Sequence, residues 1–155
     1  MSVGEADYVK DILAERGAIR FWQVAMKPGR PLAFGRLGSA WFFGLPGNPV
    51  AVVVTFYQLV QPALRRLMGE ALAIDPKFRV RCRDRLRKKP GRSEFQRGVL
   101  SVDAEGQLIV GKVGAQGSGI LTSVARANCF ILLSSTSGEV QPGDFVDVQP
   151  FHGLM

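Results

Sequence analysis

Apolar residues after Asn48 recur every three or four positions, which is the spacing of one face of an α-helix. The series consists of Val50, Val53, Val54, Tyr57, Val60, Leu64 and Leu67. Asn48 can cap the first turn, and Pro49 suits the first helical position because its missing N–H would have no partner there. Pro62 should kink or divide the helix, and Gly69 should end it. The pattern predicts a helix from Pro49 to about Met68.

The segments before this helix are typical of an α/β unit. Tyr8, Val9, Ile12 and Leu13 form the apolar side of a short helix that should end at Gly17. Strands are expected at "AIRFWQVAM", "LAFGRL" and "AWFFGL", and the last two should be joined across Gly38 and Ser39.

Between Glu70 and Pro76 the pattern changes from helical spacing to short alternating segments. Strands are expected at "FRVRCRDRL", "EFQRGVLSV", "QLIVGKV", "CFILLS" and "DFVDVQPF", with turns at Pro90-Gly91, Glu105-Gly106 and Pro142-Gly143. Short strands with this regular punctuation suggest a small barrel or sandwich. We therefore expect an α/β domain over residues 1–74 and a small β domain over residues 75–155.

Composition narrows the class of protein. The chain has 155 residues, of which 46% are hydrophobic, so it can bury a sizeable core. No apolar stretch reaches the roughly 18 residues of a membrane span, and the first residues do not resemble a signal peptide, so we expect a cytoplasmic protein. Cys82 and Cys129 fit buried reduced thiols. His152 is the only histidine, which excludes a Ser-His-Asp triad and a multi-histidine metal site.

The net charge of +7 is unevenly distributed, since ten of the twenty basic residues lie between Lys77 and Arg97. Arg79, Arg81, Arg83 and Arg85 alternate with apolar residues, as on the solvated face of a half-buried strand. A channel for an anionic small molecule and a nucleic-acid surface are the alternatives. Aromatic residues that would stack on bases are scarce, which disfavours nucleic acid.

Two rigid corners could border an anion site. Lys27 and Arg30 flank the turn "KPGRP", and "GLPGNP" precedes the N-terminus of the long helix, where amides attract anions. The alternative for the first corner is a solvated turn. Asp7, beside Glu5, either stabilises a helix dipole or binds a hard cation such as Mg²⁺. The glycines around Ser118 permit close approach of a ligand or form a plain flexible loop.

Taken together, these segments resemble the molybdopterin molybdenumtransferase family, which includes MoeA and the gephyrin E domain. The resemblance is carried by "SVGEADYVKDIL", "FWQVAMKPGRPLAFGRL", "WFFGLPGNPVAVVVTFYQLVQPALRRLMG", "GRSEFQRGVL" and "QGSGIL…NCFILL". It covers nearly the whole chain and only the C-terminal part of the family. It implies an α/β plus β fold, with part of a three-layer α/β molybdopterin-binding domain followed by a small C-terminal β-barrel.

The resemblance also implies a reaction, in which adenylylated molybdopterin and molybdate combine with Mg²⁺ and AMP is released. Asp7 matches an acidic residue at the metal, and Lys27 with Pro28 matches the turn beside the oxyanion; Asp7 and Lys27 are the catalytic candidates. The remaining ligand-binding candidates are Arg30, Pro46, Asn48, Pro49, Arg97 and Ser118, of which Arg97 and Ser118 would face molybdate across the domain interface. The complete family member is expected to be a homodimer.

This chain departs from the family pattern in ways that bear on activity. Gln23 stands where a lysine is frequent, and Ala51 where a serine is frequent. Met1 falls inside the family's "GGxSxG" motif, so we expect a fragment that is inactive on its own. The alternatives are a non-catalytic module that associates with a full-length copy or another cofactor-synthesis protein, and a basic nucleic-acid-binding barrel.

Overall fold

The computed structural model describes residue 15 and residues 17–71, 75–114 and 122–151. They divide into two compact units, one with residues 17–24 and 28–71, the other with residues 25–27 and 75–151. The sequence predicts a boundary after residue 74, with Lys27 in the first unit. The structure assigns Ala25–Lys27 to the second unit, because this segment pairs with a barrel strand.

The first unit contains an antiparallel sheet in the order β1-β3-β4. Its strands are β1 (Gly17–Gln23), β3 (Pro31–Leu37) and β4 (Ala40–Gly44). The expected connection between β3 and β4 is confirmed, since Leu37 pairs with Ala40 and Gly38 takes a positive φ of 61°. Residues of β3 alternate between the two faces of the sheet, with Ala33 and Gly35 buried on one of them.

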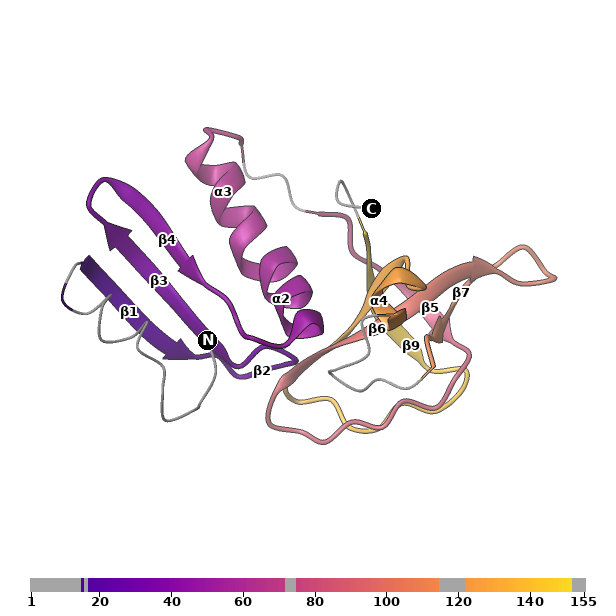
Figure 1. Ribbon diagram of the computed structural model, residues 1–155. Helices are drawn as coiled ribbons and strands as arrows, with labels where there is room; N and C mark the ends of the chain where they lie inside the picture. The colour runs from indigo at the N-terminus through magenta and orange to yellow at the C-terminus, as the bar shows by residue number, and fades with distance from the viewer. Residues whose placement is uncertain (1–14, 16, 72–74, 115–121, 152–155) are drawn as a thin grey trace. The chain divides into compact units, whose positions relative to one another are not determined.

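The long helix is divided as the sequence predicts. Its parts are α2 (Pro49–Thr55), the π-helical turn η1 (Phe56–Val60) and α3 (Gln61–Leu67), which run together beside the sheet (Figure 1). Pro62 lies in the first turn of α3, where its missing N–H removes a ladder hydrogen bond next to the π-helical turn. Gly69, with φ 84°, ends the helix and donates to the Arg66 carbonyl at 3.1 Å. No helix among the described residues is long and apolar enough to span a membrane.

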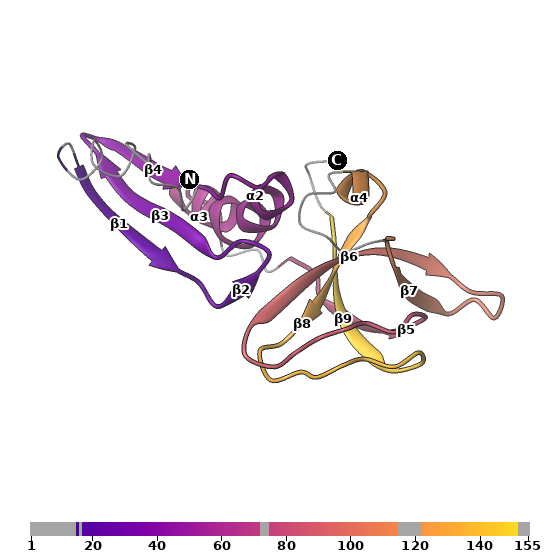
Figure 2. The same cartoon turned by 60° about the horizontal axis from the view of Figure 1, so that its bottom comes forward.

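The second unit is a closed five-stranded barrel with an extra strand, β2, which confirms the predicted C-terminal barrel (Figure 2). Its elements are β2 (Met26–Lys27), β5 (Phe78–Cys82), β6 (Ser93–Val102), β7 (Leu108–Lys112), α4 (Thr122–Ala125), β8 (Cys129–Leu133) and β9 (Phe145–Pro150). The strand order is β2-β6-β7-β5-β9-β8, and pairing between β6 and β8 closes the barrel. Closure leaves the barrel strands without an unpaired run of edge amides.

The barrel encloses one apolar core. Its buried members are Val80, Cys82, Leu86, Val110, Cys129, Ile131, Leu133, Val140, Val146 and Val148. Both cysteines are free and buried, as the sequence predicts, and burial raises the pKa of Cys129 to about 11. The arginine residues of β5 and the following segment are exposed, and the residues between them are more buried, as the alternating pattern predicts. Among them, Arg79 lies 3.9 Å from Asp147, and Arg85 lies 2.6 Å from Glu139.

Candidate anion-binding site

Lys27 belongs to the barrel because β2 pairs with β6 in parallel. Met26 lies opposite Ser93 and Lys27 opposite Glu94, and the Ser93 N–H donates to the Ala25 carbonyl at 3.0 Å. The Lys27 ammonium lies 3.4 and 3.5 Å from the two Glu94 carboxylate oxygens. The Lys27 side chain is 54% exposed and that of Glu94 only 9%. The pair therefore leaves one side of the ammonium in solvent, where a ligand can reach it.

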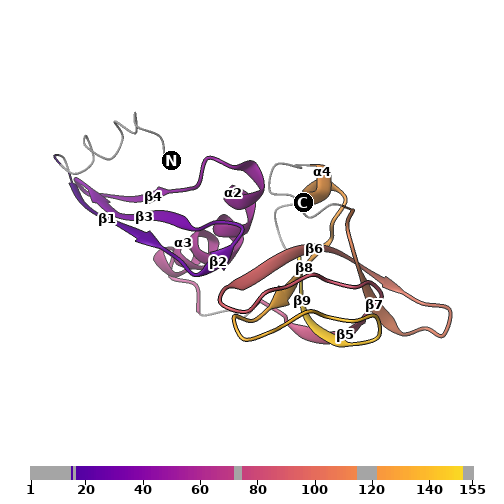
Figure 3. The same cartoon turned by 90° about the horizontal axis from the view of Figure 1, so that it is seen from below.

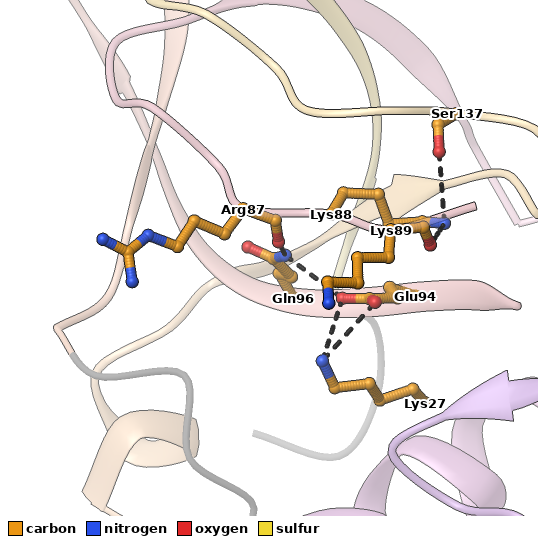
Figure 4. Close-up of polar contacts among 7 residues, drawn as sticks. All are labelled: Lys27, Arg87, Lys88, Lys89, Glu94, Gln96 and Ser137. Carbon is orange, nitrogen blue, oxygen red and sulfur yellow. Dashed lines mark hydrogen bonds and ion pairs between the residues drawn. The ribbon is translucent and has the colours of Figure 1, made fainter.

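Glu94 is also held by the residues around it (Figure 4). Gln96 donates from Nε2 to Glu94 Oε2 at 3.4 Å and to the Arg87 carbonyl at 3.2 Å. Lys88 is only 7% exposed, and its ammonium donates to the carbonyls of Lys89 at 2.9 Å and Ser137 at 3.4 Å. The Gln96 amide therefore connects the segment before β6 to the strand and holds one oxygen of the Glu94 carboxylate, and Lys88 connects the same segment to Ser137.

A pocket of 260 Å³ opens at this place in the barrel unit. Its lining residues are Lys27, Arg87, Lys88, Lys89, Pro90, Arg92 and Glu94. Five of these side chains are cationic and one is anionic, so the lining carries a net positive charge. A positive concave surface of this kind attracts small anions.

Arg97 occupies a different environment on the same strand. It is 1% exposed, and its Nε donates to Ser123 Oγ at 3.0 Å. Ser123 belongs to α4, which lies beside β6 (Figure 3). Burial lowers the pKa of the Arg97 guanidinium from its ordinary value. An arginine nevertheless stays protonated near neutral pH, so the barrel holds a buried, oriented cation here.

The strand alternation separates Lys27 from Arg97. Paired residues of neighbouring strands point to the same face, so Lys27 shares a face of β6 with Glu94 and with Gln96, two positions on. Arg97 follows Gln96 directly and therefore points to the opposite face. The structure brings Lys27 together with Glu94 and Lys88 at one pocket, and Arg97 together with Ser123.

The corner before α2 is held by its own hydrogen bonds. Asn48 accepts from the N–H groups of Val50 and Ala51 at 3.1 and 3.2 Å, so the capping side chain already engages the amides expected to hold an anion. Pro46 is buried and Pro49 exposed. The predicted N-cap is thus confirmed, and the residues of this corner have a structural role.

The turn before β3 closes through backbone and side-chain contacts. The Val24 N–H donates to the Arg30 carbonyl at 2.8 Å, across the turn that contains the half-buried Pro28. The Arg30 guanidinium donates to the Gln23 side-chain oxygen. Gln23, where the family often has lysine, therefore supports Arg30 through its amide oxygen.

Asp7 and Ser118 lie outside the described residues, as does the first predicted helix. Within residues 17–71, 75–114 and 122–151, no three histidine, cysteine, aspartate or glutamate side chains cluster as metal ligands. Sequence reasoning did not identify Lys88, Glu94, Gln96 or Ser123 as site residues. Glu94 and Gln96 occupy alternate positions of "SEFQRG", so the sequence places them on one face of a strand but does not show that this face is the buried one.

Comparison with known proteins assigns both units to one family. Residues 79–151 match the family described as the MoeA C-terminal region, domain IV, and residues 1–66 match the family of probable molybdopterin-binding domains. Among solved structures, a molybdopterin biosynthesis MoeA protein from Pyrococcus horikoshii has a TM-score of 0.77 at 28% identity, over 96% of this chain and 36% of that chain.

Among curated relatives, the molybdopterin molybdenumtransferase of Haemophilus influenzae is 46% identical over 156 aligned positions, covering all of this chain and 39% of the relative. The gephyrin of Dictyostelium discoideum is 33% identical over 94% of this chain and 24% of the relative. This chain thus spans well under half the length of the relatives it matches. Over both of its units, the chain belongs to the molybdopterin molybdenumtransferase (MoeA) family and matches the C-terminal portion of its members.

Proposed function

We propose that this chain supplies the oxyanion-binding C-terminal part of a molybdopterin molybdenumtransferase, which acts in molybdenum cofactor biosynthesis. In the proposed reaction, molybdate is inserted into adenylylated molybdopterin and AMP is released. Family membership of both units supports the proposal. The observation that carries it is the buried Arg97 guanidinium, fixed by Ser123.

Molybdate is a small dianion, and a guanidinium binds such oxyanions through directed, charge-assisted hydrogen bonds. At 1% exposure Arg97 is screened from solvent, so its attraction for an anion is stronger than that of a surface arginine. The Ser123 contact at Nε fixes the plane of the guanidinium. We therefore assign molybdate binding to Arg97, and we do not require Lys27, on the opposite face of β6, to hold the same ion.

The Mg²⁺, the homodimer and the cytoplasmic location expected from the sequence stay predictions. The metal candidate Asp7 lies outside the described residues, and the described residues offer no grouping of ligands that fits the ion.

A chimera tests this function in a complete enzyme. This chain replaces the matching 39% of the Haemophilus influenzae transferase, and molybdate-dependent AMP release is measured with adenylylated molybdopterin as substrate. We expect the chimera to turn over. Arg97→Gln should lower the rate by about two orders of magnitude, the effect of removing one pre-organised oxyanion donor.

Arg79→Gln is the matched control, because Arg79 is an exposed arginine of the barrel whose contacts are surface ones, a 3.9 Å ion pair with Asp147 and the face of the Phe145 ring at 5.8 Å. It should leave the rate unchanged. A folded chimera that releases no AMP would refute the transferase proposal and favour a non-catalytic interaction module. A chimera whose rate survives Arg97→Gln would refute the role assigned to Arg97.

A further inference from the structure

We propose that the 260 Å³ pocket beside Glu94 is a binding site for a terminal phosphate group, either inorganic phosphate or the phosphate of a monoester. The site goes beyond the proposed molybdate insertion, because Glu94 and the paired Lys27 lie on the opposite face of β6 from Arg97. Its main ligands are Lys27, Lys89 and Arg92, and Glu94 provides selectivity.

A rigid turn positions two of the cations. Lys89 and Arg92 flank Pro90-Gly91, and both side chains are exposed at the pocket. Gly91 adopts φ 113°, a conformation that favours glycine, and its N–H donates to the Ser135 carbonyl at 2.8 Å. The turn is therefore fixed to the segment after β8, and it holds Lys89 and Arg92 at the same opening.

The other two cations of this segment have different roles. Lys88 is buried and donates to two backbone carbonyls, so it adds positive charge beneath the pocket without serving as a ligand. The Arg87 guanidinium extends away from Glu94 in Figure 4, while the Lys27 ammonium points toward it. Lys27 therefore completes the set with Lys89 and Arg92.

The size of the pocket limits what can enter. Pockets that enclose whole small-molecule ligands usually measure about 300–1,000 Å³. A volume of 260 Å³ accommodates a phosphate group with a few waters, while the rest of a larger molecule would extend into solvent. The pocket thus fits the end of a ligand.

Glu94 determines which anion is favoured. An ionised carboxylate only accepts hydrogen bonds, so it repels an anion that has no proton to offer. Phosphate monoesters have a second pKa of about 6 and carry a donating proton near that pH, whereas sulfate, molybdate and phosphodiesters do not. The cations attract all of these anions, but only a protonated phosphate can donate a hydrogen bond to the Glu94 carboxylate.

The test is calorimetric titration of the whole chain at about pH 6 with inorganic phosphate, methyl phosphate, sulfate, molybdate and dimethyl phosphate. Inorganic phosphate and methyl phosphate should bind at least about tenfold more tightly than sulfate and dimethyl phosphate, the effect of one charge-assisted hydrogen bond replaced by repulsion. Molybdate is titrated into the Arg97→Gln variant, because this substitution removes the separate site assigned to Arg97. The variant should bind molybdate no more tightly than sulfate.

Single substitutions test which residues determine the affinity for phosphate and the preference for phosphate over sulfate. Arg92→Gln and Lys89→Gln alter exposed side chains, so the fold should persist, and each should weaken phosphate binding about tenfold. Glu94→Gln should reduce the preference for phosphate over sulfate to about twofold or less, because the repelling charge is gone. Arg79→Gln is the matched control and should change neither quantity.

Three results would overturn the proposal. The first is a wild-type chain that binds sulfate as tightly as phosphate. The second is phosphate binding that survives the combined Lys89→Gln and Arg92→Gln substitutions. The third is a single-stranded oligonucleotide that displaces methyl phosphate and binds with a steep salt dependence, because the pocket would then belong to a nucleic-acid surface.

Discussion

Gly98 shows how closely the barrel core is packed at a single residue. A Cβ atom at this position would lie 2.9 Å from Ile131 Cγ1, 2.9 Å from Val110 Cγ2 and 3.0 Å from Cys129 Sγ. We expect Gly98→Ala to destabilise the chain by about 1–3 kcal/mol, the usual cost of overpacking a well-packed core. Urea unfolding followed by circular dichroism measures the change.

Gly138→Ala is the matched control, since nothing lies within 4 Å of a Cβ there and the residue is outside the positive-φ region. It should change the free energy of unfolding by less than about 0.5 kcal/mol, as for other surface substitutions. Equal stabilities for the two variants would show that the core around Gly98 is looser than the structure indicates.

The buried thiol of Cys129 should make stability depend on alkaline pH. Its pKa is raised by burial from 9.0 to about 11, so the thiolate forms more readily in the unfolded chain. The stability that is present below pH 9 should therefore be lost as the pH rises toward 11, by about 2–3 kcal/mol. Cys129→Ala removes this dependence, and the difference between the two urea-denaturation series against pH isolates it. Parallel curves would contradict the prediction.

Some residue roles follow from the sequence because they depend on local geometry. Asn48 as an N-cap and Gly69 as a helix end are of this kind, and both are confirmed. The burial of Lys88 could not be predicted, because it depends on carbonyl groups of Lys89 and of the distant Ser137. From sequence alone, a lysine within a run of basic residues is predicted to be solvated, because its hydrogen-bond acceptors are not known.

At the scale of elements, the corner before α2 should depend on its cap. Asn48→Ala removes the acceptor of two backbone N–H groups, so it should cost about 0.5–2 kcal/mol and lower the midpoint of thermal unfolding. Asn48→Asp keeps the acceptor and should retain most of the stability. If Asn48→Ala and Asn48→Asp melted alike, the cap would not stabilise the helix.

The strand β2 could not be predicted from the sequence. Met26–Lys27 is too short for an alternating pattern, and the sequence instead predicts Met26 as the end of a longer strand of the first unit and Lys27 as part of the turn that follows. Its pairing with β6 joins positions 67 residues apart, as the Lys27–Glu94 contact shows. The opposite orientations of Lys27 and Arg97 follow from this register, so the candidate site could only be divided into two once the pairing was known.

For the whole molecule, the order and type of most described elements were predictable. The turn residues between segments and the spacing of apolar residues within them are clear in this sequence. The strand pattern alone did not distinguish a closed barrel from a sandwich. Closure is decided by the pairing of β6 with β8, and β6 reaches β8, β7 and β2 because it is ten residues long. Resemblance to the family supplied the reaction, whereas the basic pocket came only from the structure.

The two units should differ in independent stability. The barrel closes on itself and has its own apolar core, and β2 adds only two paired residues to it. The described sheet of the first unit has two open edges, β1 and β4, which a short sheet does not stabilise alone. We expect a fragment of residues 73–155 to unfold cooperatively in urea, and a fragment of residues 1–72 to show no cooperative transition. The barrel fragment should bind phosphate more weakly than the whole chain, because it lacks Lys27. Cooperative unfolding of the first fragment together with non-cooperative behaviour of the second would reverse this assignment of stability.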